Sequence, residues 1–487
     1  MKRCPLIEEL SAPLSANEVF TLLHQQPFSF FLDSGMDPEN LGRYSFIGSN
    51  PFLILKSRGD NLTLLGPKGR ENRKGNPFEA LDELFQEYSI EPSHSPTPLI
   101  GGAVGYFSYD LCHFIERLPC TAVDDLQLPE CCLAFYDLTI AFDHLEGKTY
   151  IASSGFPEQQ EEKRLKRAAR RIQEMKARLL TQRPKSSLQP TPFVKDSIYQ
   201  ESSGASGITL RSNFTHQEYL KAVETAREYI AAGDIFQVNL SQRFEADLPI
   251  TPCELYEHLR HINPAPFAAY LNFDEVTVVS ASPERFLKLR GDRVETRPMK
   301  GTRPRGSCGA EDEALAGELR NSIKDRAENV MIVDLERNDL GRVCRFGTIK
   351  VKELWTLEKY ATVFQLTSTV EGRLSQDKNR IDLLEACFPG GSITGAPKVR
   401  AMEIIDELEP TKRNIYTGSI GYLSFSGEMD LNIAIRTILV KDGRAYFQVG
   451  GGITYDSDPE AEYQETLDKA KALFQSLSLS PRLAVAA

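Results

Sequence analysis

The chain has 487 residues, a length that suggests about two or three domain-sized units or one large sandwich. Hydrophobic residues make up 41% and charged residues 26%, as in ordinary globular proteins, and no apolar run is long enough to span a membrane. The net charge of -11 argues against nucleic acid and anionic membranes as partners, because both require a basic surface.

Cysteine and histidine usage narrows the location and the chemistry. The nine cysteines are odd in number and contain no Cys-x-x-Cys pair, and the N-terminal stretch has no apolar signal-peptide core, so we expect a cytoplasmic protein with reduced thiols. All seven histidines lie at or before His261. If the chemistry lies after His261, catalytic triads and histidine-bound zinc are excluded, and the acid, base and metal-ligand roles fall to Glu, Asp, Lys and Tyr.

In the first part of the chain, short apolar runs alternate with predicted turns, and a predicted helix follows them. Residues 1–155 are predicted to form a strand-rich α/β unit. Residues 158–182 are predicted to form an amphipathic helix, with apolar positions at Leu165, Ile172, Met175 and Leu179. Its Lys and Arg side chains are expected to form a solvated face. Residues 183–210, rich in Ser, Pro and Gly, are predicted to be a linker.

A second helix and several strands follow the linker. Thr215 and Glu218 form a capping-box pattern, and Gly233 suits the end of that helix. Strand-like apolar runs then lead to the decapeptide RPMKGTRPRG, residues 297–306, which holds four cations. From its residues alone, Lys300 fits a solvated loop, an anion site or a catalytic amine.

Two predicted helices in the histidine-free part carry acidic side chains on one face. Asp325 and Glu328 stand three positions apart, as do Glu462 and Glu465, and Lys469 follows Glu465 by four. Each pair alone is typical of a solvated helix face. Together they offer four carboxylates without histidine, which suits a hard ion such as Mg²⁺ that keeps room for water and substrate oxygens.

Glycine-rich loops and an arginine complete the candidate features. The glycines of residues 390–395 precede a helix predicted from near Pro397, and Gly450–Gly452 end a strand. Both loops are suited to present backbone N–H groups to an anion, although tight turns explain them as well. Residues 418–440 are predicted to be a hairpin with Arg436 inside its second strand, where a buried guanidinium needs a substrate carboxylate or an internal acidic partner.

Nine short motifs in this part of the chain resemble those of the chorismate-utilising enzymes. They are SPERF, KGTRPRG, KDRAEN, VDLERND, FPGGSITGAPK, IGYLSF, AIRT, GGGI and EYQET, in that order. The resemblance covers roughly residues 5–478. It implies an α+β fold of two large, mainly antiparallel β-sheets packed as a sandwich with helices around them. It further implies an N-terminal family region over 1–182, the linker-like segment 183–210 and a chorismate-binding catalytic region over 211–478 that holds the active site.

The decapeptide separates two branches of that family. Anthranilate synthases resemble PIAGT at this place, whereas the aminodeoxychorismate synthases carry lysine, as this chain does in Met299-Lys300-Gly301-Thr302. The resemblance therefore implies amination of chorismate at C4 to 4-amino-4-deoxychorismate, on the p-aminobenzoate and folate branch. It also implies that a separate glutaminase subunit supplies the ammonia. The alternative is an anthranilate synthase of tryptophan biosynthesis.

The same resemblance assigns roles to individual residues. It implies that Lys300 is a nucleophile that adds to C2 of chorismate and that Glu284 is the general acid for the departing C4 hydroxyl. The implied Mg²⁺ ligands are Glu328 and Glu465, with Asp325 and Glu462 nearby. Residues implied to bind substrate are Arg436, Tyr422, Lys469, Thr394, Gly395, Gly450, Gly451 and Gly452. From the residues themselves, Arg297, Arg303 and Arg305 fit either tuning of the Lys300 pKa or plain surface charge.

Two places depart from the family pattern or leave it open. Gln365, which the resemblance also implies to be a substrate-binding residue, stands where members commonly have histidine. Glutamine can donate a hydrogen bond to a substrate hydroxyl but does not carry a proton near neutral pH. The N-terminal part resembles the family's tryptophan-binding region. There the implied contacts to a bound tryptophan are Asp33, Ser34, Arg43 and Tyr44, and an ordinary strand and turn explains the same residues equally well.

Overall fold

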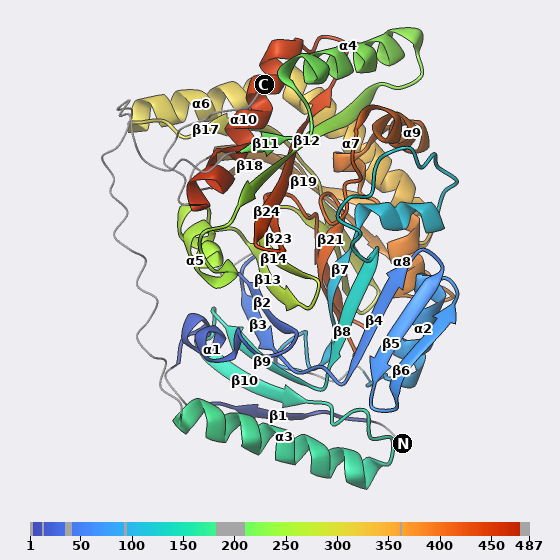
Figure 1. Ribbon diagram of the computed structural model, residues 1–487, viewed down its shortest axis with the longest axis vertical. Coiled ribbons are helices and arrows are strands. Elements are labelled where there is room, and N and C mark those ends of the chain that lie inside the picture. The colour runs from blue at the N-terminus through green and yellow to red at the C-terminus, as the bar shows by residue number, and fades with distance from the viewer. Residues whose placement is uncertain are drawn as a thin grey trace.

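Two twelve-stranded β-sheets form the centre of the computed structural model (Figure 1). The model describes residues 3–11, 14–34, 41–91, 95–181, 210–360 and 363–477. Every pair of named strands runs antiparallel. The predicted α+β sandwich of large antiparallel sheets with surrounding helices is confirmed.

The first sheet joins strands from both ends of the chain. Its neighbours, in spatial order, are β1 (Leu6–Glu9), β10 (Lys148–Ser153), β9 (Leu138–Asp143), β3 (Tyr44–Gly48), β2 (Ser29–Asp33), β13 (Phe267–Phe273), β14 (Val276–Ser282), β23 (Thr437–Lys441), β24 (Arg444–Ile453), β12 (Gln237–Asp247) and β11 (Arg211–Ser212). A short strand, β20 (Gly395–Ala396), also pairs with β12. N-terminal and C-terminal segments therefore share one sheet.

The second sheet mixes the two ends of the chain in the same way. Its order is β17 (Met299–Pro304), β19 (Val363–Arg373), β16 (Arg293–Arg297), β15 (Arg285–Arg290), β22 (Met429–Asn432), β21 (Ser419–Ser424), β7 (Gly102–Phe107), β8 (Cys131–Tyr136), β4 (Leu53–Arg58), β5 (Asn61–Gly66) and β6 (Gly69–Lys74). The strand β18 (Lys350–Lys359) pairs with β19. The predicted sequence regions 1–182 and 211–478 thus contribute to both sheets.

Helices cover the outer faces of the sheets. They are α1 (Ala16–Leu23), α2 (Pro77–Glu87), α3 (Glu161–Thr181), α4 (His216–Ala232), α5 (Pro252–Ile262), α6 (Gly309–Asn321), α7 (Ile323–Gly341), α8 (Arg380–Cys387), α9 (Lys398–Leu408) and α10 (Pro459–Ser476). No helix in the described ranges is long and apolar enough to cross a membrane. The predicted linker 183–210 lies outside the described residues apart from Leu210.

Apolar side chains fill three interfaces in this arrangement. Phe30 of the first sheet and Tyr422 of the second belong to a cluster between the two sheets. A second cluster joins the first sheet to α1, α3, α5 and α10, and a third joins the second sheet to α2, α7 and α8. Burial of these side chains at both faces of each sheet is the main stabilising contribution to the sandwich.

Local capping signals fix the ends of two helices that position the site. The Thr215 hydroxyl accepts from the Glu218 N–H, and Gly233 has a φ of 84°, so α4 begins and ends as its sequence predicts. Asp458 caps α10 by accepting from the Ala461 N–H. Ser322 ends α6 and also caps α7, so Asp325 and Glu328 lie in the first turns of the second of two consecutive helices.

Two sequence-based expectations are wrong. The apolar run that contains Arg436 is not one strand: β22 ends in the second sheet, and β23 begins in the first sheet at Thr437. Arg436 lies at this crossing with a φ of 49°. The basic side chains of α3 are not all solvated, because Arg164 is buried and Arg171 pairs with buried Asp137 at 3.1 Å. A periodic pattern identifies the face of a helix but not the polar groups beneath it.

Candidate active site

Lys300 lies where the ends of the two sheets meet. It belongs to β17, whose partner strand is β19. A methyl group built on Gly452 of β24 would lie 3.4 Å from Lys300 Nζ, so the glycine keeps open the space in front of the amine. The side chain of Lys300 makes no hydrogen bond or ion pair with any described residue. Burial lowers the pKa of Lys300, and the ammonium group of Lys469 lowers it further, against Glu328 and Glu284, which raise it.

Glu284 lies beside this amine in the turn between β14 and β15. It is 4% exposed, and its Oε1 accepts from Ser392 Oγ at 2.6 Å and from the backbone N–H of Met299 at 3.4 Å. Burial raises the pKa of Glu284 to about 7, although the Ser392 hydroxyl and the charge of Lys300 oppose the shift. A carboxyl group with such a pKa is suited to donate a proton near neutral pH.

Acidic side chains of α7 and α10 lie near the amine, and Glu328 and Glu465 among them raise the pKa of Lys300. Burial raises the pKa of Glu328 and of Glu462, and the nearby charge of Glu465 raises both further. Lys469 Nζ pairs with Glu465 Oε1 at 2.7 Å and donates to the carbonyl of Gly450 at 2.9 Å. The pKa of Glu465 is lowered, mainly by Lys469.

Glycines set how closely these helices approach the strands. A methyl group on Gly451 would lie 2.9 Å from Glu462 Oε2 and 3.7 Å from Glu465 Oε1. A methyl group on Gly301, which has a φ of 77°, would lie 2.9 Å from Asp325 Oδ1. Within the described ranges, no three carboxylate, histidine or cysteine side chains converge as a metal centre. The site therefore offers separate carboxylates rather than a complete protein cage.

The arginines of the decapeptide bind carboxylates and are not the cations that lower the pKa of Lys300. Arg297 pairs with Glu358. Arg303 pairs with Glu318 at 2.7 Å and with Asp325 at 3.2 Å, and Arg305 makes a two-pronged contact with Asp312. Arg297 thus joins β16 to β18, while Arg303 joins β17 to α6 and α7, and Arg305, just after β17, binds α6. Lys469 is the cation that lowers the pKa of Lys300, and the sequence did not indicate this effect.

The loop that contains Thr394 and Gly395 is tightly held. Gly395 has a φ of 148°, and a methyl group there would lie 2.2 Å from the Gln237 carbonyl oxygen, so glycine is required for the contact between β20 and β12. The Thr394 hydroxyl donates to the Gly390 carbonyl at 3.0 Å. The Gly391 N–H donates to the buried carboxylate of Glu336 at 3.0 Å.

Two predicted substrate contacts have different surroundings. Arg436 donates to Asn263 Oδ1 at 3.3 Å and forms no ion pair with a described carboxylate, and burial lowers its pKa. Tyr422 packs edge-on against Phe46 at 5.4 Å between ring centroids, inside the core between the sheets. No hydrogen bond between described groups joins Tyr422 to Lys300 or Glu284. Arg436 thus retains free donors for an anion, whereas Tyr422 serves the core.

Sequence reasoning missed two polar side chains at the site. Ser392 holds Glu284, and Gln237, which is 1% exposed, would have its Nε2 2.1 Å from a methyl group on Gly452. Among described groups, the Oε1 atoms of Gln237 and Gln365 have no hydrogen-bond donor. A glutamine within the apolar run IFQVNL was the available signal, because a buried polar group in a strand needs a partner.

The predicted tryptophan contacts form a separate polar cluster. Asp33 is 2% exposed, binds Arg260 and accepts from Tyr256 Oη at 3.2 Å. Ser34 donates to the Pro266 carbonyl at 3.0 Å. Arg43 pairs with Asp143 at 2.8 Å and lies over the Tyr44 ring. In this structure Asp33, Ser34 and Arg43 are thus each bound by other groups of the protein.

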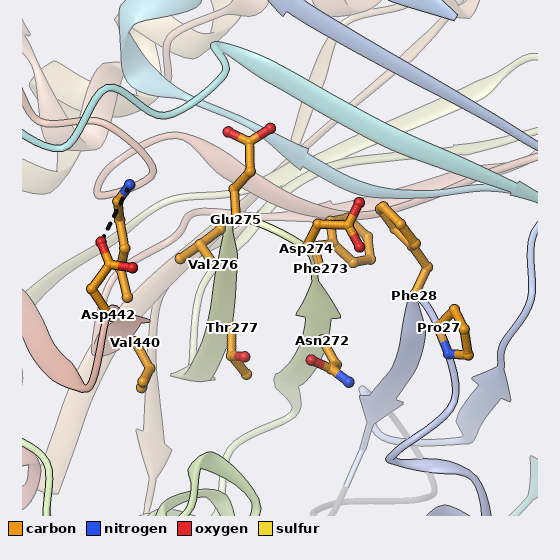
Figure 2. Close-up of a pocket in the computed structure, with 11 residues that line it drawn as sticks. Pro27, Phe28, Asn272, Phe273, Asp274, Glu275, Val276, Thr277, Val440 and Asp442 are labelled. Carbon is orange, nitrogen blue, oxygen red and sulfur yellow. Dashed lines mark ion pairs between the residues drawn. The ribbon is translucent and has the colours of Figure 1, made fainter. Parts of the chain in front are cut away.

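A cavity of about 240 Å³ lies elsewhere, at the turn between β13 and β14 (Figure 2). Its lining includes Phe28, Asp274, Glu275, Lys441 and Asp442, and none of the predicted site residues. Glu275 is held by Lys56 at 3.0 Å. The cavity therefore lies at an exposed turn whose Glu275 is paired with Lys56, and it is not part of the Lys300 site.

Comparison with known proteins identifies the family. Residues 29–475 match the model of the chorismate binding enzymes, so the chain belongs to that family. It is 40% identical to anthranilate synthase component 1 of Acetivibrio thermocellus over 96% of this chain and 93% of that protein. It is 39% identical to aminodeoxychorismate synthase component 1 of Bacillus subtilis over 90% of each.

A solved structure agrees with this assignment. The anthranilate synthase component I of Streptococcus pneumoniae superimposes with a TM-score of 0.75 at 34% identity, covering 88% of this chain and 91% of that one. The chain is thus a chorismate binding enzyme of the type shared by component 1 of anthranilate and aminodeoxychorismate synthases. Identities of 40% and 39% do not separate the two branches.

Proposed function

We propose that this chain aminates chorismate at C4 to give 4-amino-4-deoxychorismate, as component 1 of an aminodeoxychorismate synthase. The observation that carries the proposal is the amine of Lys300, which faces the site without an ion-pair partner among the described residues and has a lowered pKa. A neutral amine at that place is a nucleophile, and an alanine there would have none. A separate glutaminase subunit supplies the ammonia.

In the first step, Lys300 Nζ forms a bond to C2 of chorismate. The ring double bonds shift, the C4–oxygen bond breaks, and the leaving hydroxyl takes a proton from Glu284 and departs as water. The short contact from Ser392 occupies Oε1 of Glu284, so the transferable proton resides on Oε2. Glu284 is left as a carboxylate and Lys300 as a covalent adduct.

In the second step, ammonia forms a bond to C4. The double bonds shift back, the C2–nitrogen bond breaks, and Lys300 leaves as a neutral amine. The extra proton of the new C4 ammonium returns to Glu284 or to solvent. Chorismate and ammonia are thereby converted to 4-amino-4-deoxychorismate and water, with both side chains restored.

The carboxylates of α7 and α10 fit a bound Mg²⁺. Glu328 and Glu465 would hold the ion, with Asp325 and Glu462 close by. Burial raises the pKa of Glu328, and the neighbouring acids Asp325 and Glu465 raise it further, so a divalent cation at this carboxylate would relieve the penalty on its charge. When bound, Mg²⁺ would act as a Lewis acid on the ring carboxylate of chorismate and so would favour attack at C2. Arg436 and Lys469 would bind the substrate carboxylates, and the loops at Thr394–Gly395 and Gly450–Gly452 would line the ring.

Product analysis tests the proposal directly. Incubation with chorismate, Mg²⁺ and ammonium should give 4-amino-4-deoxychorismate, and removal of Mg²⁺ by a chelator should stop turnover. Release of anthranilate and pyruvate would instead establish the anthranilate synthase branch. Mass spectrometry of the quenched protein should find a peptide with Lys300 bearing one chorismate less one water, and a Lys300→Met variant should lack this adduct.

A further inference from the structure

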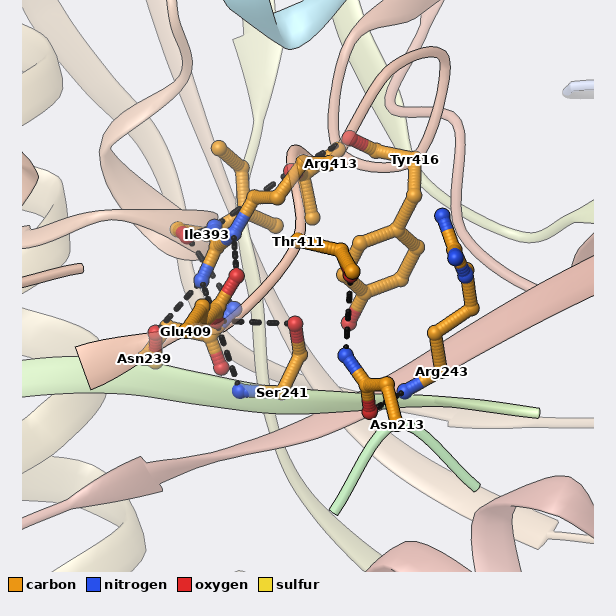
Figure 3. Close-up of polar contacts among 10 residues, drawn as sticks. Asn213, Asn239, Ser241, Arg243, Ile393, Glu409, Thr411, Arg413 and Tyr416 are labelled. Atoms are coloured by element: carbon orange, nitrogen blue, oxygen red, sulfur yellow. Dashed lines mark hydrogen bonds and ion pairs between the residues drawn. The ribbon is translucent and has the colours of Figure 1, made fainter. Parts of the chain in front are cut away.

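Arg413 lies in a fully buried network next to the acid–lysine site (Figure 3). It follows α9, and its guanidinium binds Glu409 through Nε at 2.9 Å and through Nη2 at 2.7 Å. The side chains of both partners are at most 2% exposed. Glu409 in turn accepts from the N–H and the hydroxyl of Ser241, each at 2.8 Å.

The remaining guanidinium N–H groups donate to two backbone carbonyls and one hydroxyl. Nη2 donates to the Asn239 carbonyl at 2.7 Å, and Nη1 donates to the Ile393 carbonyl at 3.0 Å and to Thr417 Oγ1 at 3.4 Å. With the two bonds to Glu409, all five guanidinium N–H groups have acceptors. The planar fork of arginine supplies this set of directions, and lysine does not.

The Ile393 carbonyl is the link to the chemistry. It also accepts from Asn239 Nδ2 at 3.0 Å, and the Asn239 N–H donates to the Thr394 carbonyl at 2.8 Å. The preceding residue is Ser392, whose hydroxyl holds Oε1 of Glu284. On the other side of Ser392, the Gly391 N–H is bound by Glu336. The short backbone segment that carries Ser392 is therefore fixed at both ends.

We propose that Arg413, braced by Glu409, is a positioning residue that holds Ser392 against Glu284 through the Ile393 carbonyl. This inference rests on the proposed role of Glu284 as general acid. Arg413 touches neither substrate nor Glu284. Its contribution is to the orientation of the acid, so that Oε1 is occupied and Oε2 presents the proton. Reaction rates are sensitive to such placement, because a shift of about 1 Å costs up to about 100-fold.

Arg164 offers a control for Arg413. It is another buried arginine with a two-pronged contact to glutamate, Glu161, and with bonds to the carbonyls of Ser154 and Cys4. It lies on α3, at the opposite end of the molecule from α9 (Figure 1). Arg164→Lys therefore loses the two-pronged contact of a buried guanidinium, here to a glutamate that is 33% exposed, without any link to Ser392.

The test compares Ser392→Ala, Arg413→Lys and Arg164→Lys with the wild-type protein, with chorismate consumption in ammonium and Mg²⁺ as the readout. We expect Ser392→Ala to lower kcat about 100-fold and Arg413→Lys to lower it about 10-fold, with KM changed less than about 3-fold. Arg164→Lys should retain wild-type kcat. Asn239→Ala removes the other donor to the Ile393 carbonyl and leaves the Arg413–Glu409 ion pair intact. It should therefore lower kcat by about the same factor as Arg413→Lys. If the Arg413→Lys protein does not fold, Asn239→Ala takes its place in the comparison.

The pH dependence of kcat distinguishes a displaced Glu284 carboxyl group from a general loss of structure. The charged groups that face Glu284 are Lys300 of β17 and Glu336 of α7, and the variants leave both unchanged. Since the Ser392 hydroxyl lowers the pKa of Glu284, its loss or displacement should move the alkaline limb of kcat to higher pH in Ser392→Ala and in Arg413→Lys.

Two outcomes would overturn the inference. The first is an equal loss of kcat in Arg413→Lys and Arg164→Lys. The second is an alkaline limb of the kcat–pH profile that moves in Ser392→Ala but stays in place in Arg413→Lys. Failure of the proposed function looks different. An anthranilate product leaves this comparison valid because consumption of chorismate is measured, whereas full activity of Glu284→Gln would remove the acid on which both proposals depend.

Discussion

Two neighbouring clusters of buried charge use the same residue types in opposite ways. Around Arg413, five donors meet five acceptors, and the ion pair with Glu409 is closed off from solvent. Around Lys300, the amine has no described ion-pair partner, and Glu284 and Glu328 have raised pKa values. A cluster in which every donor has an acceptor stabilises the fold, whereas charged groups without partners can bind a ligand or react with it.

Removing Lys300 should show the largest effect of this contrast. We expect Lys300→Met to lower kcat for 4-amino-4-deoxychorismate formation about 10⁴-fold, equivalent to about 5.5 kcal/mol, because the nucleophile is lost. The free energy of unfolding should stay equal or rise, because the lysine has no partner to leave unpaired. Steady-state kinetics and urea unfolding measure the two quantities. A large loss of stability without loss of activity would reverse the roles assigned to the two clusters.

Breaking the Arg413 cluster should act on stability first. Arg413→Met leaves the Glu409 carboxylate buried and unpaired, and we expect a loss of about 3–5 kcal/mol in the free energy of unfolding. The double variant with Glu409→Met should recover part of this loss, because no buried charge remains unpaired. Urea unfolding of the single and double variants gives the coupling free energy. Equal stability of Arg413→Met and Lys300→Met would remove the distinction between the clusters.

The range of each interaction explains what the sequence could predict. The cap at Thr215 is local and was predicted correctly, because the Thr215 hydroxyl and the Glu218 N–H that donates to it lie three residues apart. The resemblance selected Lys300, Glu284, Glu328 and Glu465, and the structure brings their side chains into one electrostatic neighbourhood.

Long-range bonding was not predictable. The partners of Arg413 include carbonyls 174 and 20 positions away, and a carbonyl leaves no mark in an amino-acid sequence. Arg436 was misplaced for a related reason: an apolar run does not show that the chain changes sheets between Asn432 and Thr437. The arginines of the decapeptide carried no sign of their carboxylate partners, which lie on β18, α6 and α7.

The smallest effect, and the sharpest comparison, concerns two buried glutamates. Glu284 must be protonated to act, so kcat should fall as pH rises through its pKa of about 7. Glu284→Gln should lower kcat about 100-fold, equivalent to about 2.7 kcal/mol, and abolish this alkaline limb. A pH–rate profile of both proteins measures it, and an unchanged limb in the variant would assign the titration to another group.

Stability should change in the opposite sense at the two glutamates. Because the folded-state pKa of Glu284 is raised from 4.5 to about 7, its contribution to stability is fully present below 4.5 and is lost as pH rises through about 7. The loss is at most about 3 kcal/mol, and Glu284→Gln should avoid it, so this variant should melt above the wild type at about pH 8. Glu409→Gln should melt below the wild type there, because the guanidinium of Arg413 loses its counter-charge. Thermal unfolding at about pH 6 and about pH 8 distinguishes the two roles. Neutralising a glutamate that completes a structural ion pair should lower the melting temperature of the protein. Neutralising a buried glutamate with a raised pKa should increase the melting temperature at the higher pH.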